Sequence, residues 1–156
     1  MSVNDPGKAL GQYAGLPTGI NIRLNKASAN TVTRGLVTRK DTTTTPDSYT
    51  QAAATALLTG PFAIPVETAG AGTTEFSARY NDVVYLRADG AMEPYTYATT
   101  SGTTAGEVVA GVAVTNNQLI GICLGTAETW QTGSPAAAAD GDLVAIYVPL
   151  GGFGNV

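Results

Sequence analysis

Short apolar segments separated by turn residues recur along most of the chain. Ile20, Ile22 and Leu24 alternate with polar residues, which is the period of two that a half-exposed strand requires. Short strands bounded by turn signals predict a mainly β fold, either a small sandwich or a small barrel. Further runs rich in apolar and β-branched residues lie at 62–66, 75–80, 82–87, 92–97, 108–114, 119–124 and 143–148.

The strongest local signal is a hairpin over residues 82–93. The Asp89-Gly90 pair lies between two strand-like runs, and Asp-Gly favours the type I′ turn, whose two central residues need positive φ. The start of this segment, 81–86, is echoed by 141–146, since in both a turn residue and an aspartate precede four strand-forming residues. We therefore expect these two strands to frame the body.

A second hairpin and a helix are also predicted. Residues 108–114 and 119–124 are apolar runs separated by two asparagines, which favour a turn. Residues 48–59 have helical character, with many alanines, polar capping residues at the start and Gly60-Pro61 to end the helix. The pattern thus predicts a small β body with at most one short helix.

The charge pattern divides the chain into two parts. Residues 1–40 carry six basic residues and only Asp5 as an acid, for a net +5, whereas 41–156 carry two basic residues and eleven acids, for a net −9. Residues 1–19 are also rich in Gly and Pro, a composition that does not bury a core. We therefore expect a basic, extended N-terminal arm over 1–40 and a β-rich body over 41–156.

The arm is expected to contact a partner with an acidic surface, because complementary charge steers docking. Aromatic residues are scarce in the arm and the body is acidic, so a nucleic acid is not expected as the partner. No apolar run is long enough to span a membrane and no signal peptide is expected. The candidate contact residues are Lys8, Arg23, Lys26, Arg34, Arg39 and Lys40.

The composition gives little support for catalysis. The chain of 156 residues has no histidine, which removes the usual general base and most zinc sites. Its one cysteine, Cys123, lies in an apolar run and is expected to be buried and inert. Asp82, Asp140 and Asp142 are expected to accept hydrogen bonds from local backbone N–H groups at strand starts. We therefore expect no enzyme activity, no cofactor or metal, and no small-molecule substrate.

Four segments, taken in order, resemble the small β-rich capsid decoration (cement) proteins of tailed bacteriophages and related viruses. They are 60–66, 81–94 with its Asp-Gly, 109–114 with its Val-Ala-Gly-Val-Ala, and 140–148 with its Gly-Asp-Leu-Val. The resemblance covers roughly residues 60–150 and implies a β-tulip-like body without an active site. It also implies a homotrimer, made in the host cytoplasm, that stabilises the exterior of the mature capsid. The N-terminal arm would then engage the major capsid protein.

Two other functions fit the sequence. One is a carbohydrate-binding β domain of a tail fibre or other virion appendage, in which Trp130, Tyr95, Tyr97 and neighbouring acids would line a groove. The other is a structural subunit of the tail-tube type.

Overall fold

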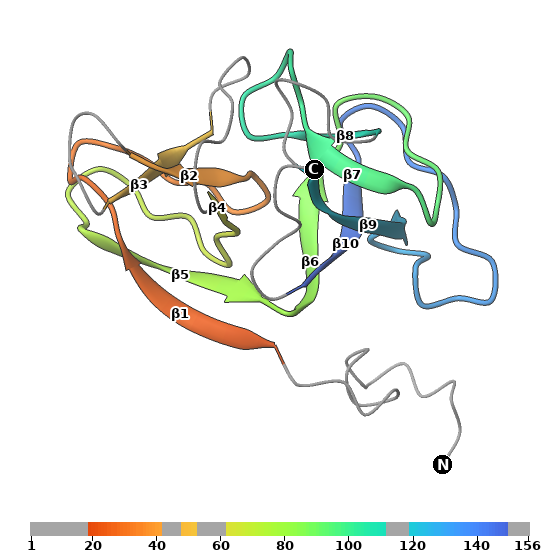
Figure 1. The fold of residues 1–156 in the computed structure, drawn as a ribbon, viewed down its shortest axis with the longest axis horizontal. Helices are drawn as coiled ribbons and strands as arrows, with labels where there is room; N and C mark the ends of the chain where they lie inside the picture. Colours follow the sequence, from red (N-terminus) through yellow and green to blue (C-terminus); the bar gives the residue numbers. More distant parts are fainter. Residues whose placement is uncertain (1–18, 42–47, 53–61, 112–118, 150–156) are drawn as a thin grey trace.

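The computed structural model describes residues 19–41, 48–52, 62–111 and 119–149, and these form strands, turns and loops without a helix (Figure 1). The prediction of a mainly β fold is confirmed. The strands fall into two groups, one before and one after Asn81. The first group consists of β1 (Ile20–Asn25), β2 (Thr38–Lys40), β3 (Tyr49–Gln51), β4 (Phe62–Ala63) and β5 (Glu75–Tyr80).

The first group contains two small sheets that are linked at both ends. Strand β1 pairs with β5 in antiparallel register, and β2 lies between β3 and β4. A bridge from Pro65 to Ala78 joins the continuation of β4 to β5, and a bridge from Lys26 to Tyr49 joins the end of β1 to β3. The group therefore encloses a small core of its own, made of Val32, Ala63, Ala69, Phe76 and Ala78.

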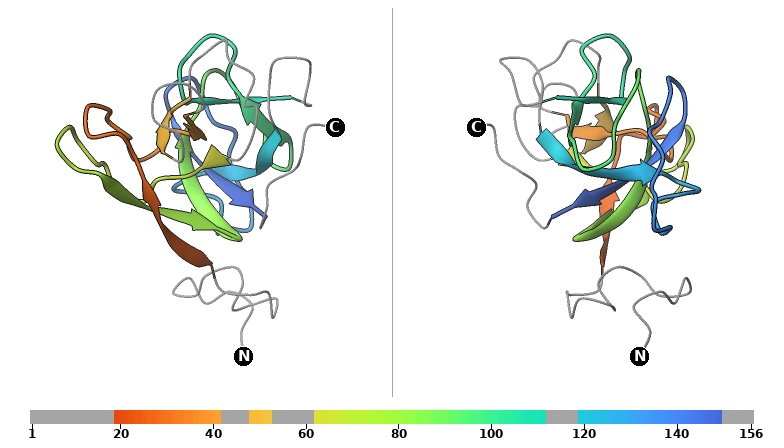
Figure 2. Two further views of the ribbon diagram at one scale, coloured as in Figure 1. Left: turned by 60° about the vertical axis from the view of Figure 1, so that its left-hand side comes forward. Right: turned by 90° about the vertical axis from the view of Figure 1, so that its right-hand side faces the viewer.

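The second group is one sheet of five strands, in the order β6-β10-β9-β7-β8. A bridge from Ala88 to Val108 connects the chain just after β6 with β8, so the sheet curls toward closure along part of its length. In Figure 1 and in the left view of Figure 2, this sheet lies beside the ribbon of β1 and β5. The strands are β6 (Asp82–Arg87), β7 (Tyr97–Thr100), β8 (Val108–Ala110), β9 (Leu119–Thr126) and β10 (Leu143–Val148).

The larger core lies on the inner face of the five-stranded sheet. Val84 and Leu86 on β6 and Ile146 on β10 point inward, while the residues between them point out, as strand alternation requires. Burying one such side chain contributes about 1.5–3 kcal/mol. Phe62 and Ile64 of the first group belong to this core as well, so packing as well as the chain connects the two groups.

The two groups meet at a sharp corner. Asn81 has φ of 54°, in the left-handed region that asparagine tolerates better than most residues. The Tyr147 hydroxyl donates to its Oδ1 at 3.3 Å, and Arg79 and Asp82 form an ion pair of 3.4 Å across the corner. Strand β5 therefore ends in one sheet and β6 begins in another.

Both predicted hairpins are wrong in their pairing. The neighbour of β6 is β10, with register from Asp82–Val148 to Arg87–Leu143, so the two similar strands that we expected to frame the body lie side by side. The predicted type I′ turn requires positive φ at both Asp89 and Gly90, but only Gly90 has it. Likewise β7 lies between β8 and β9. In both cases, pairing that buries an apolar face prevails over a local turn preference.

The predicted arm and helix also need correction. Residues 20–40 contain β1 and β2, and these strands pair with β5, β3 and β4, so this part of the segment is folded. Residues 1–18 lie outside the described residues, and an extended arm there stays a prediction. Tyr49–Gln51 forms a strand where a helix was predicted, because its partner β2 completes a sheet. Residues 53–59 of the predicted helix lie outside the described part.

Gly121 allows β9 to approach β10 closely. A Cβ at this position would lie 2.7 Å from Ile146 Cγ2 and would collide with the Tyr147 carbonyl oxygen. We expect Gly121→Ala to lower the free energy of unfolding by about 1–3 kcal/mol, because the two backbones must separate. Gly70→Ala is the control, since nothing lies within 4 Å of its added Cβ. Equal stability of the two variants in urea denaturation would contradict this account of the β9–β10 contact.

Candidate functional site

Arg23 is one of the predicted contact residues, and the structure gives it partners within the chain. Its guanidinium lies 3.0 Å from Glu67 and 3.3 Å from Glu75, and it also donates to the Ser77 hydroxyl at 3.0 Å. Arg23 and the two glutamates border an open, polar groove of about 350 Å³. Because two glutamates balance the charge of Arg23, this residue is a weak candidate for attracting an acidic partner.

Lys26 was predicted to contact a partner, but it is only 3% exposed. Its ammonium donates to the carbonyl oxygens of Asn30 and Thr73 at 2.7 Å each, and to that of Ala27 at 3.3 Å. A buried charge is tolerated when such hydrogen bonds replace its hydration. Lys26 therefore connects the 27–30 turn to the 70–74 loop through hydrogen bonds. It is too buried to be one of the residues that contact a partner.

Three of the predicted residues remain on the surface of the first strand group. Arg34 is exposed in a turn that contains a hydrogen bond from Leu36 N to Thr33 O. Arg39 and Lys40 are partly exposed on β2. Arg39 Nε is buried without a hydrogen-bond partner among the described residues. Lys8 lies outside the described residues. The five described members of the set thus lie on β1, on β2 and in the segment between these two strands.

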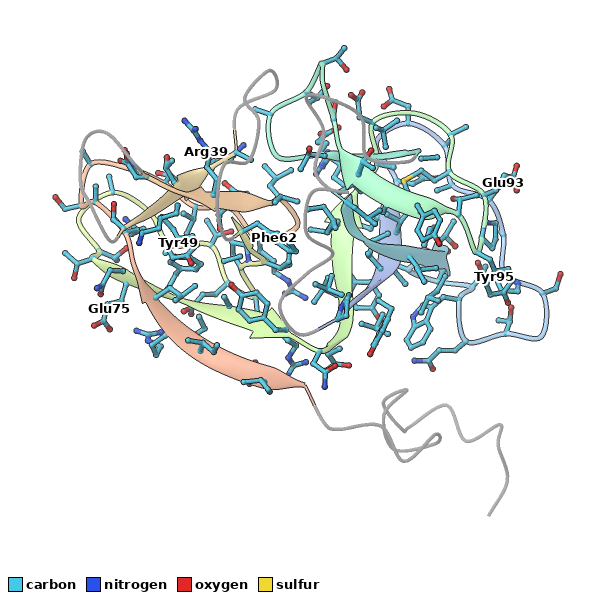
Figure 3. The ribbon with its side chains drawn as sticks, in the orientation of Figure 1. Arg39, Tyr49, Phe62, Glu75, Glu93 and Tyr95 are labelled. Carbon is cyan, nitrogen blue, oxygen red and sulfur yellow. The ribbon has the colours of Figure 1, made fainter. Side chains whose placement is uncertain are left out.

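Charge is nevertheless segregated between the two strand groups. Among the described residues, 19–80 contain six basic residues and three acids, for a net +3. Residues 82–149 contain Arg87 as a base and seven acids in their described part, for a net −6. The charge boundary of the folded chain therefore falls at the Asn81 corner, and in Figure 3 Arg39 lies left of centre, over the first strand group, and Glu93 lies at the right.

Three carboxylates of the second group lie close together. Asp89, Glu107 and Asp140 each place an oxygen within 4.8 Å of the others. Asp89 accepts hydrogen bonds from the Ser101 and Thr103 hydroxyls, and these lower the pKa of Asp89. Such an oxygen-rich cluster has the donor type that a hard cation such as Ca²⁺ prefers.

Each member of this cluster and its neighbours also has a partner within the chain. Asp140 Oδ1 accepts from Gly90 N at 3.1 Å, and Arg87 Nε lies 3.9 Å from Glu107. Asp142 Oδ2 accepts from Ala139 N at 2.8 Å, and Asp82 Oδ1 from Val83 N at 2.7 Å. The contacts of Asp82 and Asp142 are local, as predicted for turn aspartates at strand starts, whereas Asp140 contacts the backbone of Gly90, which is fifty residues away in sequence.

Cys123 is fully buried on β9, as predicted. Burial raises the pKa of its thiol, so the reactive thiolate is disfavoured.

The aromatic residues predicted for a sugar groove lie on different elements, with Tyr97 on β7, Tyr95 just before it and Trp130 in the turn after β9. Trp130 donates from Nε1 to the Tyr85 hydroxyl at 3.2 Å, over β6. Tyr97 lies on β7, opposite Ile122, and is 49% exposed. Tyr95, just before β7, is 73% exposed and has φ of 67°. Sequence reasoning found these residues but missed Tyr85, whose outward direction follows from strand alternation once β6 is assigned.

A solved structure shares this fold. It is the N base of head fiber gp8.5 of bacteriophage phi29, with a TM-score of 0.54 and 11% sequence identity. The likeness covers 86% of this chain and 98% of that one. No family model matches the chain, and no curated protein matches it. In its described part the chain has no helix that is long and apolar enough to cross a membrane.

The carboxylate cluster predicts an unusual pH dependence of stability. Burial and repulsion by Asp89 raise the pKa of Glu107, although Arg87 opposes the shift. A raised pKa in the folded state means that protonated Glu107 favours folding, and this contribution is lost as the pH rises through that value. Glu107→Gln should therefore stabilise the protein at pH 7, with a smaller effect at pH 3, where the carboxyl is protonated in both states.

Urea denaturation at the two pH values measures this difference. Glu128→Gln is the matched control, because Glu128 is exposed in a turn away from the cluster. A lower stability of Glu107→Gln at pH 7 would show that the ion pair with Arg87 outweighs burial and repulsion.

Proposed function

We propose that the chain is a structural protein of a tailed-bacteriophage virion, which binds the outer surface of the mature capsid and stabilises it. The observation that carries the proposal is the shared fold, since nearly the whole of a head fiber base from a bacteriophage aligns with most of this chain. The segments that resemble capsid decoration proteins support the same assignment. The protein would be made in the host cytoplasm and then assemble on the particle.

The contact with the major capsid protein is made by the N-terminal segment 1–40, through its folded part. Strands β1 and β2 belong to the positively charged strand group, and Arg34, Arg39 and Lys40 are at least partly exposed there. Positive charge on this group favours an acidic patch on the shell, while the acidic second group is directed away from it. Lys26 is excluded, because its ammonium is buried.

Stabilisation follows from mass action. A protein that binds only the mature shell shifts the equilibrium toward that state, by an amount that grows with its concentration relative to Kd. Many identical sites on one shell add these contributions. A homotrimer is the assembly that the resemblance implies, and a closed ring would bury apolar side chains such as Tyr97 and Leu143 that one copy leaves exposed.

The proposed role is not enzymatic. The chain contains no histidine, and the carboxylates that lie close together are engaged by hydroxyls, backbone N–H groups and Arg87. No nucleic acid, membrane, cofactor or small-molecule substrate is invoked.

A second candidate function is glycan binding by a virion appendage. The observation that favours it is Tyr95, which presents a 73% exposed ring from a left-handed backbone conformation that is uncommon for tyrosine. The indole N–H of Trp130 donates to the Tyr85 hydroxyl, so Trp130 is not shown to form a groove together with Tyr95. The proposal of capsid binding therefore comes first.

Charge reversal tests the capsid contact. We expect Arg34→Glu and Lys40→Glu each to weaken binding to purified capsids lacking this protein by about tenfold, because an attraction becomes a repulsion. Arg87→Glu on the second group is the control and should bind normally. Co-sedimentation at low and raised salt measures affinity, and salt should weaken the wild type more than the variants. Full binding by both variants would exclude this surface, and specific binding to a glycan array instead would favour the second candidate.

A further inference from the structure

Strand β1 has one edge that is not covered by any other strand of the described residues. Its register with β5 on the opposite edge is regular over all six residues, and the bridge from Lys26 to Tyr49 lies beyond its last residue, Asn25. Figure 1 shows β1 along the lower border of the first strand group, with β5 on its inner side. Natural edge strands are commonly blocked by a proline, a bulge or a lysine, and β1 contains none of these. Its free edge is therefore suited to the addition of another strand.

The backbone groups on this free edge belong to the odd-numbered residues of β1. Lys26 N donates to Thr74 O across the ribbon at 2.9 Å. In an antiparallel pair, residues whose N–H and C=O groups face the partner strand alternate with residues whose groups face away from it. Counting back from Lys26, the even-numbered residues face β5 and the odd-numbered ones face outward. Asn21, Arg23 and Asn25 therefore present outward N–H and C=O groups that have no partner among the described residues.

Two polar side chains of β1 are held toward β5, away from the free edge. Arg23 forms ion pairs with two glutamates and donates to the hydroxyl of Ser77, the residue opposite it on β5. The side-chain oxygen of Asn21 accepts a hydrogen bond from Arg79 Nε at 3.0 Å. Because the charge of Arg23 is balanced and directed across the ribbon, it does not block the edge.

The other face of β1 carries apolar side chains that are partly open to water. Ile20 and Ile22 are opposite Tyr80 and Ala78, on the face that contributes to the small core of the first group. Each of the two isoleucines is nevertheless 38% exposed. A strand added at the free edge, with apolar residues at alternate positions, would remove this surface from water.

Strand β1 of a second copy has this pattern, and two-fold symmetry restricts its register. In an antiparallel pair across a two-fold axis, the residue on the axis lies opposite its own copy. With Ile22 on the axis, Ile20 is opposite Leu24 of the second copy. Arg23 is then opposite Asn21 of the second copy, and their outward backbone groups can exchange hydrogen bonds. With Arg23 on the axis, two guanidinium groups would be directly opposite each other, which is destabilising. The register centred on Ile22 is therefore favoured.

We propose that β1 pairs with β1 of a second copy in antiparallel register about Ile22, so that the two ribbons form one continuous sheet. An acidic strand of another protein would gain little at this edge, because two glutamates already balance the charge of Arg23. The contact does not use the side chains of Arg34, Arg39 and Lys40, which are assigned to the capsid, and it does not depend on capsid binding. It is small, so a high local concentration, as on a shell that carries many copies, favours it.

Cysteine cross-linking in the full chain tests the register. Ile22→Cys should form a disulfide between two copies under mild oxidation, because the residues on the axis are a non-hydrogen-bonded pair with Cα atoms about 4.5 Å apart. Ile20→Cys is the matched control, since Ile20 has the same exposure and lies on the same face. Its two Cα atoms would be about 14 Å apart, too far for a disulfide. We expect Ile22→Cys to cross-link about tenfold faster. Equal rates, or no cross-linked dimer of either variant, would overturn the proposal.

A charge exchange at the axis distinguishes this contact from association through another surface. Ile22→Lys and Ile22→Glu each place two like charges opposite each other, so each should need about tenfold more protein than the wild type to associate in sedimentation velocity. An equimolar mixture of the two should associate as the wild type does, because a lysine then faces a glutamate. The proposal is overturned if the single variants associate like the wild type, or if the mixture associates no better than they do. These measurements use the isolated protein, so a failure of capsid binding would leave their results unchanged.

Discussion

The corner at Asn81 is the constraint on which the rest of the fold depends. One residue separates β5 from β6, and a hairpin needs at least two residues to reverse the chain. The two strands therefore cannot be neighbours in one sheet, and each takes a partner distant in sequence: β5 pairs with β1, and β6 pairs with β10. The left-handed backbone of Asn81, the hydroxyl of Tyr147 and the Arg79–Asp82 ion pair hold this geometry.

The corner also separates the properties of the surface. The first strand group carries net positive charge among its described residues and the second carries net negative charge, while Phe62 and Ile64 of the first group pack into the core of the second. A molecule with opposite charges at its two ends has a preferred orientation near an acidic surface. This polarity is the physical basis of the proposed attachment to a capsid.

Sequence patterns predicted well which segments form strands. They predicted poorly which strands pair with one another. Runs of strand-forming residues after a turn residue and an aspartate identified β6 and β10, and the apolar run around Cys123 correctly predicted its burial. These patterns did not identify the partner of each strand, since the Asp89-Gly90 turn signal is local and the β6–β10 pairing spans some sixty residues. The predicted arm included folded residues for a similar reason. Nothing in the sequence indicates that Lys26 is buried, because only the fold brings three carbonyl oxygens to its ammonium.

A cryo-electron microscopy map of virions that carry this protein would show how the molecule is oriented on the particle. We expect density for the protein on the outside of the shell, with β1, β2 and the turn at Arg34 against the major capsid protein. The carboxylate cluster of Asp89, Glu107 and Asp140 should face away from the shell. A map in which the acidic strand group contacts the shell, or in which the protein is absent from the capsid surface, would contradict this expectation.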